Sequence, residues 1–345
     1  MILHEDKSDP IVSVAILYHV GSNREEKGRT GFAHLFEHML FQESQHVGQD
    51  QFFRKIQGAG GELNGGTSFD YTIYFEIVPK NALEMCLWLE ADRMGYLLPT
   101  VTTEAFANQQ EVVQNEKRQR VDNVPYGHTN YVIHKSLFPE DHPYNWQVIG
   151  SFEDLKNATL ADVRQFFVKW YGPNNATLVI AGDYDKAQTK QWVEKYFGEL
   201  KPAAPEPKPT PVTLDKTKRA FHEDNFARSP ELTMSFPTVQ QYHKDAYALD
   251  LLADLLSDGK KAPLYKVIVE EKKLAPSAPA FQQSLEVTGY FQFRARAFPD
   301  KSLTEAEKAM HEALARFEKE GFTDRDLARI KPKPKPISIT AFRAS

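Results

Sequence analysis

Apolar and polar positions along the first 200 residues follow a mixed order of strand-like and helix-like segments. Residues 11–20 are rich in β-branched side chains and predict a buried strand, while residues 71–78 alternate as a half-buried strand does. A third strand is expected at 176–181, before the turn GDYD. Six further segments are expected to be helical: 31–41, 49–59, 80–97, 103–121, 160–171 and 186–197. Strands and helices in this order predict an α+β fold.

The stretch that follows, residues 201–213, contains five prolines and few apolar residues, so it predicts a semi-rigid connector. Beyond it the pattern starts again, with strands expected at 231–236 and 287–297. The helices expected there are 244–257, 263–272, 303–320 and one that begins at 323. We therefore expect two similar α/β lobes, residues 1–200 and residues 214–330, of which the second is shorter and incomplete.

Both ends of the chain depart from this pattern. The helix that begins at 323 runs into KPKPKP at residues 331–336, and no helix interior tolerates three prolines. Reading the codons two bases out of frame allows a helix-compatible sequence without a stop, so we expect residues 331–345 to be a frameshifted, non-native and disordered tail. The start, MILHEDKSDP, carries charges where a signal peptide needs an apolar core, and we expect the natural protein to begin upstream.

Composition narrows the possible functions. Charged residues make up 26% of the chain and hydrophobic ones 41%, which is typical of a globular protein, and no run reaches the ~18 apolar residues of a membrane span. The net charge is −5 without a basic stripe, so nucleic acid is not an expected partner. The single cysteine, Cys86, excludes an internal disulfide, and its apolar neighbours predict a buried structural thiol rather than a nucleophile.

The candidate chemistry lies in the segment GFAHLFEHMLF, residues 31–41, whose only polar side chains are His34, Glu37 and His38. Thr30 precedes it and is the expected N-cap. Positions four apart on a helix differ by about 40°, so both imidazoles share one face with the carboxylate beside them. This arrangement is typical of a zinc site that carries its own base. The alternative is a pair of hydrogen-bonded core histidines, but buried polar groups are costly unless something satisfies them.

The string His-x-x-Glu-His inverts the His-Glu-x-x-His motif and is typical of the inverzincin class of zinc peptidases. Together with VVQNEKRQR at residues 112–120 and FFVKWYGPNNATLVIAGD further on, it resembles the pitrilysin/insulinase family of metallopeptidases, peptidase family M16. The resemblance runs from residue 1 to about residue 330. It implies repeated α/β lobes of the LuxS/MPP-like type, each a sheet and its packed helices in two layers, that face each other as a clamshell.

A catalytic zinc usually has three protein ligands and one open position, so the two histidines need a third ligand. The resemblance supplies Glu116, on a later helix, and gives Glu37 the role of general base. Without the resemblance Glu116 is an ordinary solvated helix residue, and Glu37 could be a fourth ligand. Family members often carry a carboxylate seven residues before the third ligand. Gln109 stands there in this chain, and Glu111, the nearest carboxylate, is expected to support the metal ligands instead.

The resemblance also assigns residues that bind peptide. Asn64 in GELNGGTS matches an asparagine at the head of an edge strand that takes an extended peptide by main-chain pairing, and Phe41 matches a pocket-lining aromatic. From the sequence alone, Asn64 is equally well a turn residue and Phe41 a core residue. His128, His134 and His142 have no compact metal-ligand spacing, and we expect them to be solvated or hydrogen-bonded loop residues.

The implied activity is that of a zinc metalloendopeptidase acting on peptides or small unfolded proteins, with one Zn²⁺ per chain. Family members use an Arg–Tyr pair from the opposite lobe to hold the substrate carbonyl, but Phe291 and Ser302 occupy those positions here. We therefore expect a partner subunit or a C-terminal half to supply the pair. The resemblance also implies a periplasmic or other extracytoplasmic location. The alternatives are a non-catalytic or truncated family member acting as an assembly subunit, and a structural zinc protein, which would need a fourth ligand.

Overall fold

The computed structural model describes residues 1–205 and 216–331. These residues form two compact units: residues 1–205 together with Thr217–Glu223, and Lys216 together with residues 224–331. The segment 217–223 therefore packs with the first unit, although the sequence analysis assigned it to the second lobe. Most of the predicted connector and all but the first residue of the predicted tail lie outside the described residues.

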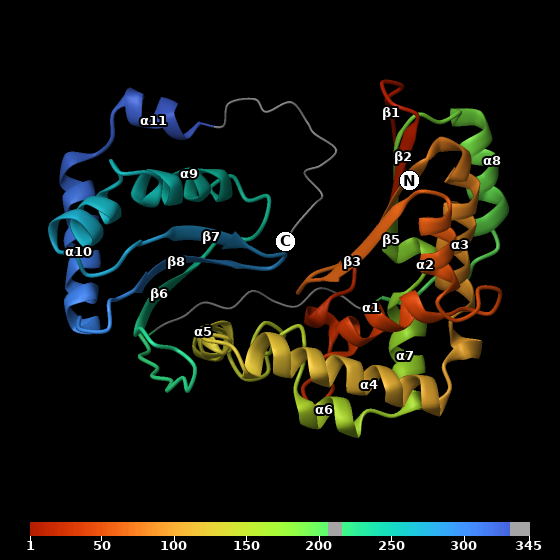
Figure 1. The fold of residues 1–345 in the computed structure, drawn as a ribbon, viewed down its shortest axis with the longest axis horizontal. Coiled ribbons are helices and arrows are strands. Elements are labelled where there is room, and N and C mark those ends of the chain that lie inside the picture. The colour runs from red at the N-terminus through yellow and green to blue at the C-terminus, as the bar shows by residue number, and fades with distance from the viewer. Residues whose placement is uncertain (206–215, 332–345) are drawn as a thin grey trace. The chain divides into compact units, whose positions relative to one another are not determined.

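A five-stranded sheet forms the centre of the first unit (Figure 1). Its spatial order is β1-β5-β2-β4-β3, and the strands are β1 (Ile2–Glu5), β2 (Ile11–Tyr18), β3 (Glu62–Thr67), β4 (Thr72–Pro79) and β5 (Ala176–Gly182). Strand β2 pairs antiparallel with β4 and β5, and β1 pairs parallel with β5. Strand β3 pairs antiparallel with β4 and lies at the edge of the sheet, so one side of its backbone is open to a further strand.

The helices of the first unit pack on this sheet or on one another. They are α1 (Phe32–Gln42), α2 (Gln51–Gly58), α3 (Leu83–Tyr96), α4 (Thr103–Lys117), α5 (Thr129–Leu137), α6 (Phe152–Asn157), α7 (Leu160–Trp170) and α8 (Lys186–Phe197). Alternate residues of β4 are fully covered, and Tyr74 among them contacts both α1 and α3: its ring lies 5.2 Å from that of Phe41 and 4.0 Å from the guanidinium of Arg93. Helices α1 and α3 therefore pack on the same face, which gives the expected two layers.

Arg93 on α3 is a buried cation beneath the end of α1. It donates hydrogen bonds to Glu90 and to Glu76, and its guanidinium also lies 4.4 Å from the centre of the Phe52 ring. The two carboxylates and the aromatic faces offset the cost of burying the charge. Arg93 thereby links β4, α2 and α3 into a rigid base for the C-terminal end of α1.

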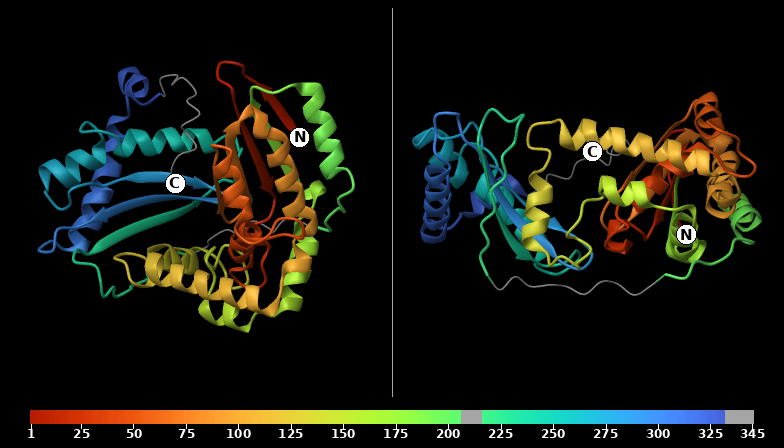
Figure 2. Two further views of the ribbon diagram at one scale, coloured as in Figure 1. Left: turned by 45° about the vertical axis from the view of Figure 1, so that its right-hand side comes forward. Right: turned by 90° about the horizontal axis from the view of Figure 1, so that it is seen from below.

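The second unit is built around a three-stranded antiparallel sheet of order β6-β8-β7 (Figures 1 and 2). Its strands are β6 (Glu231–Thr238), β7 (Ala280–Ser284) and β8 (Gly289–Arg296), and its helices are α9 (Ala246–Ser257), α10 (Leu303–Glu320) and α11 (Asp324–Ile330), with a π-helical segment at Tyr265–Glu271. Phe291 and Phe293 of β8 pack into its core with residues of α9 and α10.

The expected α+β fold is confirmed, and so are most helices and the long strands. Among the elements that were missed, β3 was taken for a glycine-rich turn, α5 lies in a region expected to be loose, and α6 and β7 were not expected at all. The helix expected at 103–121 is α-helical only to Lys117 and ends in a π-helical turn, Arg118–Asp122.

Candidate active site

Helix α1 is held at its start by a residue that the sequence analysis did not single out. Gly31 precedes it with a φ of 92°, and Glu25 accepts hydrogen bonds of 2.9 Å from the backbone N–H groups of Gly31 and Ala33. The carboxylate is buried, satisfies otherwise free N–H groups and faces the positive end of the helix dipole. The expectation that Thr30 caps the helix is wrong, because its hydroxyl donates to Asp154 instead.

The two histidines of α1 converge with Glu116 of α4. The Nε2 atoms of His34 and His38 lie 3.6 and 3.1 Å from the same carboxylate oxygen, Oε2 of Glu116. One ligand atom from each of these three residues lies within 4.8 Å of the other two. Ligand atoms around a tetrahedral zinc with bonds of about 2.0–2.1 Å lie about 3.3 Å apart, so the separations fit a single zinc ion. No fourth His, Cys, Asp or Glu joins the group among the described residues.

The environment favours the forms of His34 and Glu116 that could bind a metal. Burial, together with the neighbouring His38, lowers the pKa of His34 to about 4. The hydrogen bond with His38 lowers the pKa of Glu116, although partial burial opposes that effect. Arg120 also pairs with the other oxygen of Glu116, at 2.7 Å. A neutral imidazole and a carboxylate are the states that coordinate zinc, so His34 and Glu116 have the protonation states of metal ligands at neutral pH.

Glu37 lies beside the ligands without joining them. Burial raises the pKa of its carboxyl group, and the hydroxyl of Thr67, which donates a hydrogen bond of 2.7 Å to Oε2, acts in the opposite direction. Thr67 is the last residue of the edge strand β3. The carboxylate thus links α1 to the end of the edge strand β3.

The predicted peptide-binding residues flank this edge. Asn64 is exposed on β3, where its Oδ1 accepts a hydrogen bond of 2.8 Å from the backbone N–H of Gly65. Phe41 is partly buried against Phe52 and Tyr74, and its ring faces Gly65, where an added Cβ would come within 2.9 Å of it. Phe41 therefore lies against β3 near the end of α1. Asn64 and Phe41 both remain candidates for substrate contact.

Glu111 does not lie with the ligands. It is exposed, and five positions along a helix turn the side chain by about 140° away from Glu116. Gln109 is seven positions from Glu116, on nearly the same face, and it is buried with its Oε1 unpaired among the described residues. Burial therefore favours Gln109 over Glu111 as the supporting residue of the site.

The other histidines that the sequence offered stay apart from the metal ligands. His134 is buried on α5, and its Nδ1 lies 2.7 Å from the backbone oxygen of Tyr144. His142 is also buried, with its Nδ1 accepting from the N–H of Tyr144. His128 lies 3.6 Å from Asp122. The expectation of hydrogen-bonded residues holds for His134 and His142, but His134 lies on a helix rather than in a loop.

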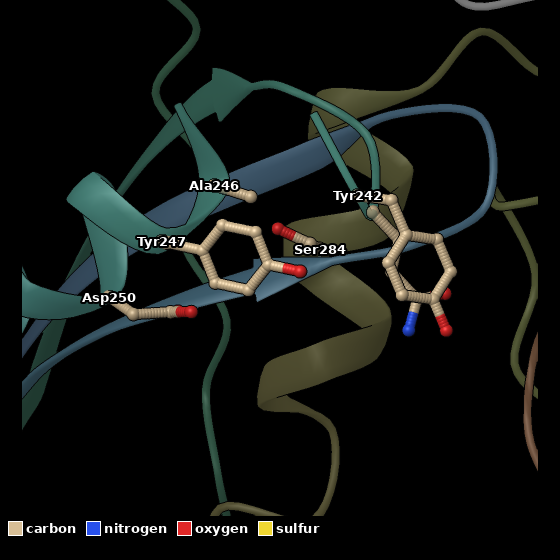
Figure 3. Close-up of a pocket in the computed structure, with 6 residues that line it drawn as sticks. Tyr242, Ala246, Tyr247, Asp250 and Ser284 are labelled. Carbon is tan, nitrogen blue, oxygen red and sulfur yellow. The ribbon is translucent and has the colours of Figure 1, made fainter. Parts of the chain in front are cut away.

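The second unit contributes a shallow pocket of about 270 Å³ between the start of α9 and the end of β7 (Figure 3). It is lined by Gln241, Tyr242, Ala246, Tyr247, Asp250 and Ser284. Figure 3 shows the two tyrosine rings and Ser284 around the opening, and none of the predicted site residues lies there.

None of the described helices is long and apolar enough to span a membrane.

Family profiles match this chain over almost its whole length. The profile described as Insulinase (Peptidase family M16) matches residues 1–142, and the one described as Peptidase M16 inactive domain matches residues 157–333. The chain belongs to peptidase family M16. All four residues of the candidate centre lie within the first of these matches, and the described helices and strands of the second unit lie within the other.

Curated M16 relatives include proteins described as zinc proteases. PqqE of Helicobacter pylori is 30% identical over 339 residues, which are 97% of this chain and 76% of that protein. The uncharacterized zinc protease YmxG of Bacillus subtilis is 23% identical over 340 residues, 97% of this chain and 80% of its own length.

Solved structures show the same M16 fold. A protease from Helicobacter pylori superposes with a TM-score of 0.87 at 28% identity, over 95% of this chain and 80% of that one. The first half of the periplasmic protease PqqL from Escherichia coli superposes with a TM-score of 0.72 over 95% of this chain and 72% of that one. Its 21% identity supports the fold alone.

Proposed function

We propose that this M16 chain is a zinc metalloendopeptidase in which His34, His38 and Glu116 hold one zinc ion. The observation that carries the proposal is the convergence of two imidazoles on one carboxylate oxygen, with a second carboxylate, Glu37, beside them. Three ligands with an open fourth position are typical of catalytic rather than structural zinc. The relatives described as zinc proteases support the choice of metal.

Glu37 acts as the general base in this proposal. A zinc ion at the site would polarise the scissile carbonyl and lower the pKa of a water towards ~7. Glu37 takes a proton from the attacking water and gives it to the leaving amine as the peptide bond breaks. Because burial raises the pKa of its carboxyl group, Glu37 is a stronger base than an exposed glutamate, which suits both transfers.

The peptide binds along the open edge of β3. An extended segment added there as a sixth strand would pair with the main chain of β3 and would pass next to Thr67 and Glu37. Main-chain pairing accepts many sequences but requires an unfolded segment, which is why peptides and small unfolded proteins are the proposed substrates. Asn64 and Phe41 flank this edge and are the proposed side-chain contacts.

The second candidate is a family member that serves as an assembly subunit. The match of residues 157–333 to an inactive domain favours a non-catalytic role for the second unit, but the metal and base residues all lie in the first match. We therefore propose a catalytic chain that works with another M16 chain, which supplies an arginine and a tyrosine for the substrate carbonyl. A periplasmic location is proposed from the neighbour PqqL, which is described as periplasmic.

Zinc stoichiometry measured together with peptide cleavage tests the proposal. The expected result is one zinc per chain, bound tightly enough to survive desalting, and cleavage of an unstructured fluorogenic peptide that a chelator abolishes and zinc restores. A chain that binds no zinc, or cleavage that the chelator leaves intact, would exclude this mechanism.

A further inference from the structure

Thr67 is the only side-chain hydrogen-bond partner of Glu37 among the described residues, and it lies on β3 rather than on α1, the helix of Glu37. Its hydroxyl donates to Glu37 Oε2 at 2.7 Å from the last position of β3. We propose that Thr67 is a positioning residue that fixes the carboxylate of Glu37 in its working orientation and couples it to the strand on which the peptide docks. This inference rests on the proposed function of Glu37.

The direction of this hydrogen bond is set by its neighbours. Thr72, which faces Thr67 across the pair β3–β4, donates its own hydroxyl proton to the backbone oxygen of Val20 at 2.8 Å. Its oxygen lies 3.4 Å from that of Thr67. The one proton of the Thr67 hydroxyl therefore goes to the carboxylate, which can only accept when it is ionised. A β-branched side chain in a strand has restricted χ1 freedom, so the donor is held in place before the substrate arrives.

A second contact ties β3 to α1 two residues earlier. Gly65 lies against the ring of Phe41 so closely that a Cβ would come within 2.9 Å of it. These two contacts fix the distance between β3 and α1 at the point where a docked peptide would pass. A base that is held by the docking strand stays aligned with a substrate carbonyl that is held by the same strand. Misplacing such a group by 1 Å can lower the rate about a hundredfold.

The test uses two substitutions of Thr67 in the zinc-loaded full chain. Thr67→Val keeps the shape but removes the hydroxyl, and Thr67→Ser keeps the hydroxyl. For Thr67→Val we expect unchanged zinc content, a KM within about twofold of wild type and a kcat lower by about 10- to 100-fold. Thr67→Ser should recover most of the lost kcat. Full activity in the valine variant, or equal losses in both variants, would overturn the proposal, since equal losses would indicate packing rather than hydrogen bonding.

A crystal structure of the zinc-loaded valine variant gives a readout that does not depend on activity. We expect the Glu37 carboxylate to leave its wild-type position or to lose defined density while His34, His38 and Glu116 stay in place. An unmoved, well-ordered Glu37 would refute the positioning role. Glu37→Gln is the reference for the function itself: if that variant still cleaves peptides, the proposed mechanism is wrong, whereas failure of the Thr67 prediction alone leaves it standing.

Discussion

A single substitution can distinguish the proposed role of Glu37 as a base from that of a metal ligand. Glu37→Gln keeps the size and the hydrogen-bonding capacity of the side chain but removes the base. We expect the variant to keep one zinc per chain and to lose peptide hydrolysis by at least about a thousandfold in kcat/KM, because the proton transfers lose their acceptor. Metal analysis and a fluorogenic peptide assay measure the two effects. Glu116→Gln is the matched comparison and should lose zinc as well, and loss of zinc from Glu37→Gln would show that Glu37 is a ligand.

His134 makes the stability of the first unit depend on pH. Burial lowers its pKa to about 4, while in the unfolded chain an imidazole titrates near 6.5. The unfolded chain therefore binds the extra proton between pH 6.5 and 4, so stability is complete above about 6.5 and falls as the pH drops through that window. From pH 7 to pH 5 the contribution of His134 is a loss of about 2 kcal/mol.

Urea unfolding of the wild type and of His134→Gln at both pH values measures this contribution. Chelator in every sample removes the separate effect of metal release. The variant is expected to be less stable at pH 7, because it loses packing against Phe69, but to lose about 2 kcal/mol less than wild type on going to pH 5. Parallel pH profiles of the two proteins would contradict the assignment.

Some residues of the candidate centre could be predicted individually from the sequence. The two histidines and Glu37 lie on one helix, where spacing alone determines a common face, so their proximity could be predicted. Glu116 lies on another helix, and only the family resemblance led to it. Glu25 was missed because its role depends on where a loop lies in the fold, and hydrophobic periodicity does not record that. The same limit explains the wrong cap assigned to Thr30. Gln109 was noticed at its position, but the supporting role was given to Glu111 because Glu111 is a carboxylate.

The junction between β3 and α1 can be tested at Gly65. An added Cβ there would lie 2.9 Å from the Phe41 ring and 3.0 Å from the Tyr74 ring, so the strand and the helix would have to move apart. We expect Gly65→Ala to destabilise the chain by about 1–3 kcal/mol and to lower peptide cleavage, because β3 also carries Thr67. Gly66→Ala is the matched control, since nothing lies within 4 Å of its added Cβ. Equal stability of the two variants in urea unfolding would rule out the close contact.

Strands and helices with a clear local pattern of apolar residues could be predicted from the sequence. Strands β2, β4 and β5 carry β-branched residues, which pack well in a sheet, and their alternation or continuous burial is visible in the sequence. Strand β3, ELNGGT, has two glycines and little intrinsic preference for a strand. It is extended because β4 supplies its hydrogen bonds, and that pairing is a tertiary effect. Helix α5 escaped prediction for a related reason, since its neighbours are polar and irregular.

The second unit shows why the whole chain is expected to need a partner. Phe291, which the family resemblance places at the position of the arginine, is buried in the core beside Phe293. Ser302, which the resemblance places at about the position of the tyrosine, accepts a hydrogen bond from the N–H of Thr304 and caps α10. Phenylalanine has no hydrogen-bond donor, and the serine is engaged in the helix cap. Neither residue is therefore suited to hold a substrate carbonyl.

We expect the zinc-loaded chain alone to cleave peptides slowly, and an M16 partner chain that carries the arginine and the tyrosine to raise kcat/KM by about a hundredfold or more. The magnitude follows from the loss, about 10²–10³ in rate, that accompanies removal of one donor to a developing oxyanion. Titrating the candidate partner, such as the product of a neighbouring gene, into a fixed concentration of this chain measures the effect, and Glu37→Gln in this chain must abolish it. A partner in which the arginine is replaced by alanine should bind equally well and activate less. If the purified chain by itself reaches a kcat/KM of about 10⁴ M⁻¹s⁻¹ or more, in the range of ordinary enzymes, the second unit needs no such help and the proposed partnership is wrong.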